Sequence, residues 1–226
     1  MKDAILIIGG AFNPVHTQHI ALLCLAKDKL EATSEWNILG GYLAVATDGY
    51  VSHKLHSRNE RTIKLNHRLA LVYEAMKDVP WLLNSPFQEE MLKQHDGSAM
   101  ALGQRLKRLL KNDNIQILIL IGGDRMVKKR CVGRVMEDEI DLFTIWQDDL
   151  DKHLIHNPKD FILLNILLRS VSSSLVRNHL TQWFNAKDNL EEQMQLENDL
   201  VNSKCFLHSP VMSYIKTHHD NLYIDI

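Results

Sequence analysis

Short apolar runs alternate with segments of helical spacing along this chain. Residues 4–8 (Ala-Ile-Leu-Ile-Ile) form an uninterrupted apolar run, which is typical of a strand buried on both faces of a parallel sheet. Two glycines end this run, and the apolar positions of residues 17–30 then have close to helical spacing. The chain is therefore predicted to open with a strand, a glycine turn and a helix.

The same alternation continues to the end of the chain. It predicts further strands over residues 38–46, 81–83, 115–121, 142–146 and 161–164, and helices over residues 67–76 and 98–110, from residue 173 onward, and after an N-cap at Ser209. Strands and helices that alternate around glycine turns indicate an α/β fold. We expect a Rossmann-like, doubly wound parallel sheet with helices on both faces, followed by a C-terminal helical portion over residues 171–226.

Domain organisation follows from length and local composition. The 226 residues, of which 45% are hydrophobic and 24% charged, are enough for a buried core. We expect residues 1–226 to form a single domain. Residues 185–204 are charged and amide-rich, which favours a solvated helix or an inserted loop.

Charge and cysteine usage exclude several classes of protein. A formal net charge of -2 and a pI near 6.6 argue against binding of a nucleic-acid backbone. The three cysteines are widely separated, which favours a reducing compartment over a disulfide framework or a zinc site. The first apolar run is too short for a signal peptide or a membrane span. We expect no membrane association and a cytoplasmic location, with the nucleus as the alternative. The sequence leaves open whether the protein forms a homo-oligomer.

The residues between the first strand and the first helix carry the main candidate chemistry. The backbone at Gly10, Ala11 and Phe12 lies at the carboxyl end of a strand, and the free N–H groups of a helix start attract phosphate. His16 and His19 are three residues apart on the first turn, so both imidazoles can donate hydrogen bonds to one triphosphate. The alternative is an ordinary turn followed by two exposed histidines.

Two separated motifs carry a family resemblance. The chain lacks GxGxxG after the first strand and lacks GxxxxGK[ST]. Residues 9–19 resemble the GGxFNPxH and HxGH signatures of the nucleotidylyltransferase superfamily, with Gln18 in place of the glycine. Residues 171–177 resemble its second signature, ISSTxxR. A serine-rich helix start followed by an arginine presents donors to phosphate oxygens, although the serines alone are also typical of an N-cap.

Within the superfamily, the chain resembles the nicotinamide and nicotinate mononucleotide adenylyltransferases. The resemblance implies transfer of AMP from ATP to a pyridine mononucleotide, which forms NAD or deamido-NAD and releases pyrophosphate, with Mg²⁺ as cofactor and no protein side chain as a metal ligand. It implies three groups of site residues, which are catalytic His16, His19 and Arg177; ATP-binding Gly10, Ala11, Phe12, Ser172, Ser173 and Ser174; and substrate-binding or dinucleotide-binding Asn13, Tyr50, Lys54, Trp81, Gly122 and Asp124.

Several of these assignments have structural alternatives. Trp81 is also a plausible core residue, and Asp124 is also a plausible N-cap for the basic residues 125–130, a segment typical of a solvated helical face. Residues 132–135 lack the second tryptophan that sandwiches the pyridine ring in the family. Alternative functions are a transferase of the phosphopantetheine or cytidylyl type, a nucleotide sensor without turnover, and, last, a nucleic-acid binder.

Overall fold

The computed structural model describes most of the chain, in residues 1–56, 58–87, 90, 93, 96–112, 114–122, 140–146, 161–166, 168–169 and 171–224. Asp124 and the segments 125–130 and 132–135 lie outside the described residues. Two compact units interleave along the sequence; the first comprises Met1–Gly10, Leu22–Ala44 and Trp81–Leu168, and the second comprises Ala11–Ala21, Val45–Pro80 and Arg169–Ile226. None of the described helices is long and apolar enough to cross a membrane.

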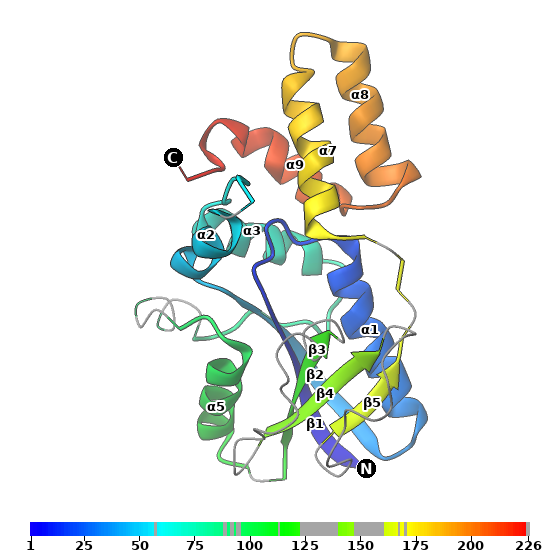
Figure 1. The fold of residues 1–226 in the computed structure, drawn as a ribbon. Helices are drawn as coiled ribbons and strands as arrows, with labels where there is room; N and C mark the ends of the chain where they lie inside the picture. Colours follow the sequence, from blue (N-terminus) through cyan, green and yellow to red (C-terminus); the bar gives the residue numbers. More distant parts are fainter. Residues whose placement is uncertain are drawn as a thin grey trace. The chain divides into compact units, whose positions relative to one another are not determined.

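The first unit contains a five-stranded sheet in the order β2-β1-β3-β4-β5 (Figure 1). Its strands are β1 (Lys2–Gly10), β2 (Trp36–Val45), β3 (Gln116–Gly122), β4 (Ile140–Trp146) and β5 (Phe161–Asn165). The pairs β1·β3, β3·β4 and β4·β5 are parallel, with Ile5 beside Ile117 and Ile119 beside Leu142. The predicted α/β sheet is confirmed. Its strand order reverses between β1 and β3, the kind of position where open α/β sheets bind ligands.

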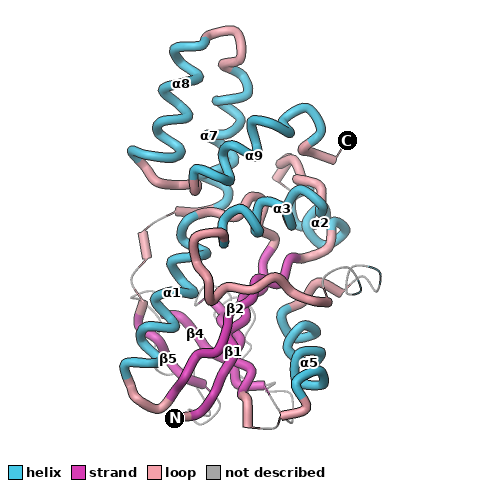
Figure 2. The backbone as a smooth tube through the Cα atoms, turned by 180° about the vertical axis from the view of Figure 1, so that it is seen from behind, coloured by secondary structure: helices cyan, strands magenta, loops and turns pink. Residues whose placement is uncertain are grey.

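Both faces of the sheet are covered, as the uninterrupted apolar runs require. On one face Ile5 and Ile7 of β1 belong to a cluster with Leu102 and Leu106 of α5 (Ala99–Leu110). Leu6, which alternates with them, is fully buried on the opposite face. Figures 1 and 2 show α5 on one side of the sheet and α1 (Thr17–Ala32) on the other.

The glycine at the end of β1 serves the packing of α5. Ser98 caps this helix by accepting a hydrogen bond from the Ala101 N–H at 3.1 Å. A Cβ at Gly9 would lie 3.0 Å from the Cβ of Ala99, in the first turn of α5. The close approach of strand and helix therefore explains Gly9 without any ligand.

The second unit is largely helical. Its elements are the start of α1, then α2 (Asp48–His56), α3 (Leu65–Met76), α7 (Ser173–Asn185), α8 (Leu190–Asn198), a π-helical turn (Asp199–Ser203), α9 (Ser209–His218) and a short 3-10 helix (His219–Asn221). Figures 1 and 2 both show α7 and α8 side by side. The segment predicted as a solvated helix or an inserted loop is thus mostly helix, with no buried residue in α8.

Three local predictions differ from the structure. The sequence pattern did not indicate α2, whose start is fixed by a tertiary ion pair at Asp48. Instead of a strand over residues 81–83, there is an isolated parallel bridge between Gly41 and Leu82. The N-cap position of α9 belongs to His208 rather than to Ser209, which is the first helical residue.

Candidate functional site

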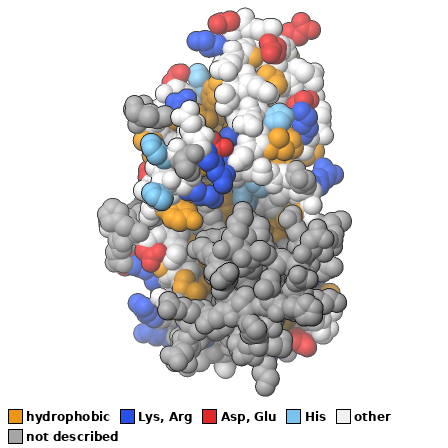
Figure 3. All heavy atoms as spheres, in the orientation of Figure 1, with side chains coloured by type: hydrophobic (Ala, Val, Ile, Leu, Met, Phe, Trp, Pro, Cys, Tyr) orange, Lys and Arg blue, Asp and Glu red, His pale blue; other side chains and the backbone are white. Residues whose placement is uncertain are grey.

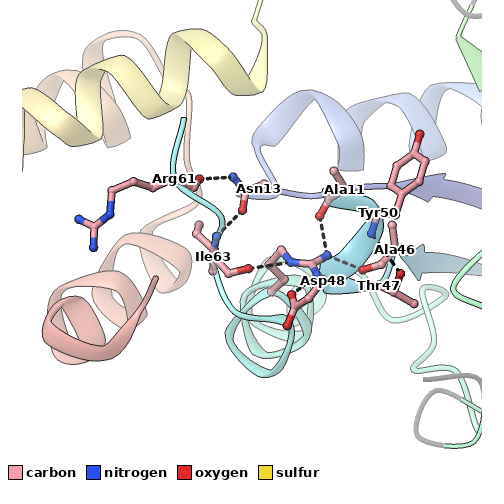
Figure 4. Close-up of polar contacts among 9 residues, drawn as sticks. Ala11, Asn13, Ala46, Thr47, Asp48, Tyr50, Arg61 and Ile63 are labelled. Carbon is pink, nitrogen blue, oxygen red and sulfur yellow. Dashed lines mark hydrogen bonds and ion pairs between the residues drawn. The ribbon is translucent and has the colours of Figure 1, made fainter. Parts of the chain in front are cut away.

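The segment between β1 and α1 is held in place through the side chain of Asn13. Its Nδ2 donates to the carbonyl of Arg61 at 3.0 Å, and its Oδ1 accepts from the N–H of Ile63 at 2.7 Å (Figure 4). The preceding Phe12 has a left-handed φ of 44° and a buried ring, a conformation that costs roughly 1–2 kcal/mol in a residue with a Cβ. The hydrogen bonds of Asn13 therefore stabilise a backbone conformation at Phe12 that is unfavourable for a residue with a Cβ. The Asn13–Pro14 peptide bond is cis.

A fully buried arginine, Arg68, ties this segment to its neighbours. Its Nε donates to the carbonyl of Ile63 at 2.9 Å, and its Nη1 donates to the carbonyls of Ala11 at 3.0 Å and Ala46 at 2.6 Å (Figure 4). Its Nη2 pairs with Oδ1 of Asp48 at 2.7 Å. Burial lowers the pKa of Arg68, and the Asp48 carboxylate opposes that change. Sequence reasoning assigned no role to Arg68, because three of its four partners lie 20 or more residues away in the chain.

The structure brings His16 and His19 into contact. Their ring centroids are 3.7 Å apart with planes inclined by 30°, and the rings of Phe12 and His19 make a T-shaped contact. The backbone N–H of His16 donates to Nδ1 of His19 at 3.1 Å. Because Nδ1 of His19 accepts this bond, the neutral ring carries its proton on Nε2, where it can be donated to a ligand.

Both imidazoles are neutral at physiological pH. Burial lowers the pKa of His16 to about 4, with further lowering by the charges of Arg177 and His208. Burial also lowers the pKa of His19 well below its ordinary value, and His16 and Lys54 lower it further. Neutral imidazoles donate hydrogen bonds without the cost of burying a charge, and a bound anion would raise both pKa values.

Arg177 completes the site from the start of the second turn of α7. Its Nη1 donates to the carbonyl of Asn13 at 2.8 Å, and its Nη2 contacts Oε2 of Glu60 at 2.5 Å and Oγ of Ser174 at 2.9 Å. The guanidinium is thus fixed beside the histidine segment, with part of its charge balanced by Glu60. Glu60 was also missed by sequence reasoning, since it is 117 residues away from its partner and lies in no motif.

The serines before Arg177 have different roles. The hydroxyl of Ser172 accepts from the N–H of Leu175 at 3.2 Å, so this residue is the N-cap of α7. Ser174 supports the guanidinium. The N-cap interpretation therefore holds for Ser172 in the structure, and binding of ATP by residues 172–174 stays a prediction.

The first turn of α1 is anchored from the other end of the sequence. The N–H of Thr17 donates to the carbonyl of Phe206 at 3.0 Å, and its hydroxyl donates to the carbonyl of Cys205 at 2.6 Å. The N–H groups of Phe206 and Leu207 donate to the carbonyl of Leu200, which closes the turn after α8. The segment after α8 thus supports the histidine pair, and the N–H of Thr17 is occupied by a protein carbonyl.

The remaining predicted residues lie in different places. Tyr50 and Lys54 are exposed on α2, and the ammonium of Lys54 is near enough to His19 to affect its pKa. Gly10, Trp81 and Gly122 belong to the first unit. There, a Cβ at Gly41 would lie 2.4 Å from the indole of Trp81. Asp124 is outside the described residues.

The described residues contain no group of three acidic, histidine or cysteine side chains that could hold a metal ion. On the described part of the face in Figure 3, basic, acidic and histidine side chains are interspersed with hydrophobic ones.

Comparison with known proteins places this geometry in context. The family described as cytidylyltransferase-like matches residues 7–179. The nicotinamide/nicotinic acid mononucleotide adenylyltransferase 1 of Bos taurus is 26% identical over 80 residues, a match covering 35% of this chain. That match spans only 26% of the relative's own length.

Two solved structures share the fold over nearly the whole chain. The Plasmodium falciparum nicotinic acid mononucleotide adenylyltransferase complexed with APC has a TM-score of 0.62 at 16% identity, and the match covers 97% of this chain and 96% of that one. The complex with NaAD has a TM-score of 0.60 at 15% identity, with 96% of each chain covered.

Proposed function

The chain belongs to the cytidylyltransferase-like family, and on this basis we propose that it is an adenylyltransferase that transfers AMP from ATP to nicotinamide or nicotinate mononucleotide. The observation that carries the proposal is the pair of neutral imidazoles, His16 and His19, beside the buried guanidinium of Arg177. The fold shared with the Plasmodium falciparum adenylyltransferase supports the same assignment. Both units would then work together as one nucleotidylyltransferase domain.

The reaction requires the two substrates to be positioned correctly, and it does not require a nucleophile from the protein. A phosphate oxygen of the mononucleotide attacks the α-phosphorus of ATP, the bond from that phosphorus to the bridging oxygen breaks, and pyrophosphate leaves. The attacking phosphate is already anionic at neutral pH, so no general base is needed. Nε2–H of His19 and the imidazole of His16 stabilise the charge that develops on the triphosphate, and Arg177 holds the β and γ phosphates.

The other ATP contacts follow from the motifs. The backbone of Gly10, Ala11 and Phe12 and the residues Ser172, Ser173 and Ser174 would line the phosphates. Because the described residues offer no cage of metal ligands, Mg²⁺ would be held by the phosphates and water, which suits this ion. When bound, magnesium supplies neutralisation of charge on the leaving pyrophosphate.

For the acceptor we propose the residues implied by the family resemblance, which are Asn13, Tyr50, Lys54, Trp81, Gly122 and Asp124. An indole such as that of Trp81 suits a pyridine ring, because flat π-systems favour offset stacking. Asn13 has already engaged its amide with two backbone groups, so it would contact the ligand through its remaining N–H. The ammonium of Lys54 would bind the phosphate of the mononucleotide.

A direct assay tests the proposal. The purified protein is incubated with ATP, magnesium and each pyridine mononucleotide, and pyrophosphate and dinucleotide are quantified by chromatography. We expect both products, and we expect His19→Ala to lower turnover about a hundredfold, as for other preorganised donors. Met194→Ala, at a 63% exposed position on α8, is the control that should retain turnover. Near-normal turnover of His19→Ala would refute its role, and the absence of product with all pyridine mononucleotides would refute the acceptor.

A cytidylyl transfer is the second candidate, because the matched family is described as cytidylyltransferase-like. Replacing ATP with CTP in the same assay separates the two donors. A transferase acting on phosphopantetheine is tested with that acceptor. A nucleotide sensor would bind ATP without forming either product.

A further inference from the structure

Glu60 is the acidic partner of the arginine that is proposed to hold the phosphates. Its Oε2 lies 2.5 Å from Nη2 of Arg177, and the two side chains form an ion pair. The first turn of α7 carries no acidic residue of its own, so this carboxylate comes from a loop 117 residues away in the chain. Glu60 belongs to neither signature motif, and its role in the reaction needs a separate explanation.

The backbone of the loop after α2 fixes the position of Glu60. Its N–H donates to the carbonyl of Leu55 at 3.3 Å, and Leu55 is 2% exposed. Asn59 has a left-handed φ of 53°, which turns the chain back at this point. The carbonyl of the next residue, Arg61, accepts from Nδ2 of Asn13 at 3.0 Å (Figure 4). The backbone at Glu60 is therefore held on both sides by hydrogen bonds that do not involve its carboxylate.

Both hydrogens of Nη2 of Arg177 are engaged within the protein. One lies against Oε2 of Glu60 and the other against Oγ of Ser174, which is 2.9 Å from the nitrogen. Nη1 donates to the carbonyl of Asn13 at 2.8 Å, and Arg177 as a whole is 8% exposed. A phosphate oxygen that binds Nη2 must therefore displace one of its two present acceptors.

Glu60 is the acceptor that a phosphate is expected to displace. Its side chain is 21% exposed, against 10% for that of Arg177, so it borders solvent. A carboxylate and a phosphate repel each other, whereas the hydroxyl of Ser174 is neutral and can itself donate to a phosphate oxygen. A buried guanidinium needs an anion beside it. Glu60 supplies that anion in the ligand-free protein, and a phosphate can supply it in the complex.

We propose that Glu60 is a positioning residue that acts through Arg177, and that its carboxylate occupies, in the ligand-free protein, the place on Nη2 that a phosphate of the nucleotide takes in the complex. This inference rests on the proposed function for the identity of the nucleotide. The exchange forms and breaks no covalent bond. It keeps the guanidinium oriented while the site is empty, and it weakens the binding of pyrophosphate because the carboxylate competes for the same donor.

Calorimetric titration with magnesium pyrophosphate measures this competition. Glu60→Gln keeps the shape of the side chain and an acceptor oxygen for Nη2 but removes the negative charge, so pyrophosphate should bind about tenfold more tightly than to the wild type. A residue that only supports the structure of the site would give weaker or unchanged binding when its charge is removed. Glu74→Gln, which removes a carboxylate from the ion pair with Lys77 at the end of α3, is the matched control and should bind as the wild type does.

The outcomes separate this inference from the proposed function. Equal or weaker pyrophosphate binding by folded Glu60→Gln overturns the exchange, even if the wild type forms the dinucleotide. Tighter binding in a protein that forms no dinucleotide supports the exchange and overturns the transferase reaction. If the variant does not fold, a crystal structure of the wild type with magnesium pyrophosphate decides. The exchange requires a phosphate oxygen within hydrogen-bond distance of Nη2 of Arg177 and the carboxylate of Glu60 displaced from it, and an intact ion pair in that complex overturns the proposal.

Discussion

Acid should destabilise this protein through His16. Its imidazole has an ordinary pKa of 6.5, which burial first, and then Arg177 and His208, lower to about 4 in the folded state. Between these two values the unfolded chain binds more protons than the folded one, so stability rises with pH across that interval. The contribution is complete above pH 6.5 and is lost progressively as the pH falls toward 4. Each pH unit is worth about 1.4 kcal/mol, so the full loss is roughly 3 kcal/mol.

Urea unfolding of the wild type and of His16→Gln at pH 7.5 and pH 5.0 isolates this contribution. Protonation of His16 in the unfolded chain should lower the unfolding free energy of the wild type by about 2 kcal/mol between pH 7.5 and pH 5.0. The variant has no imidazole at this position, so it should not show this loss. Other histidines with lowered pKa values, such as His67 and His208, titrate in both proteins and largely cancel in the difference. The substitution itself shifts stability at both pH values equally. If both proteins lose the same free energy between the two pH values, the buried neutral imidazole is refuted.

Three further perturbations test the supports of the site. Arg68→Met removes four hydrogen bonds and leaves three carbonyls and a carboxylate without their partner. Urea unfolding should therefore show a loss of about 3–5 kcal/mol in the free energy of unfolding. A loss below about 1 kcal/mol would contradict the role of Arg68 in holding this segment. Gly41→Ala places a Cβ 2.4 Å from the Trp81 indole, which should cost about 1–3 kcal/mol and shift the tryptophan fluorescence, whereas an unchanged spectrum would argue against the contact. Thr17→Val loses the hydrogen bond to the carbonyl of Cys205, so turnover in the dinucleotide assay should fall about tenfold and recover in Thr17→Ser; equal turnover of all three proteins would rule out this anchoring.

The strands of the sheet and the histidine pair could be predicted because they depend on local features. Uninterrupted apolar runs such as residues 4–8 are stable only when both faces are covered, so they indicate an interior parallel strand. The three-residue spacing of His16 and His19 at a helix start similarly limits where their rings can lie. Gly9 was predicted only to end the first strand, and the structure adds that its missing Cβ leaves room for Ala99 of α5.

The long-range supports of the site could not be predicted from the sequence. Glu60 is 117 residues from Arg177, and Thr17 is 188 residues from Cys205, yet each pair is in direct contact. The sequence by itself determined the α/β alternation and the two signature segments, because hydrophobic period and local spacing act over a few residues. Tertiary structure alone decided which buried polar groups satisfy one another, because a buried donor needs an acceptor wherever packing brings one, whatever their separation along the chain.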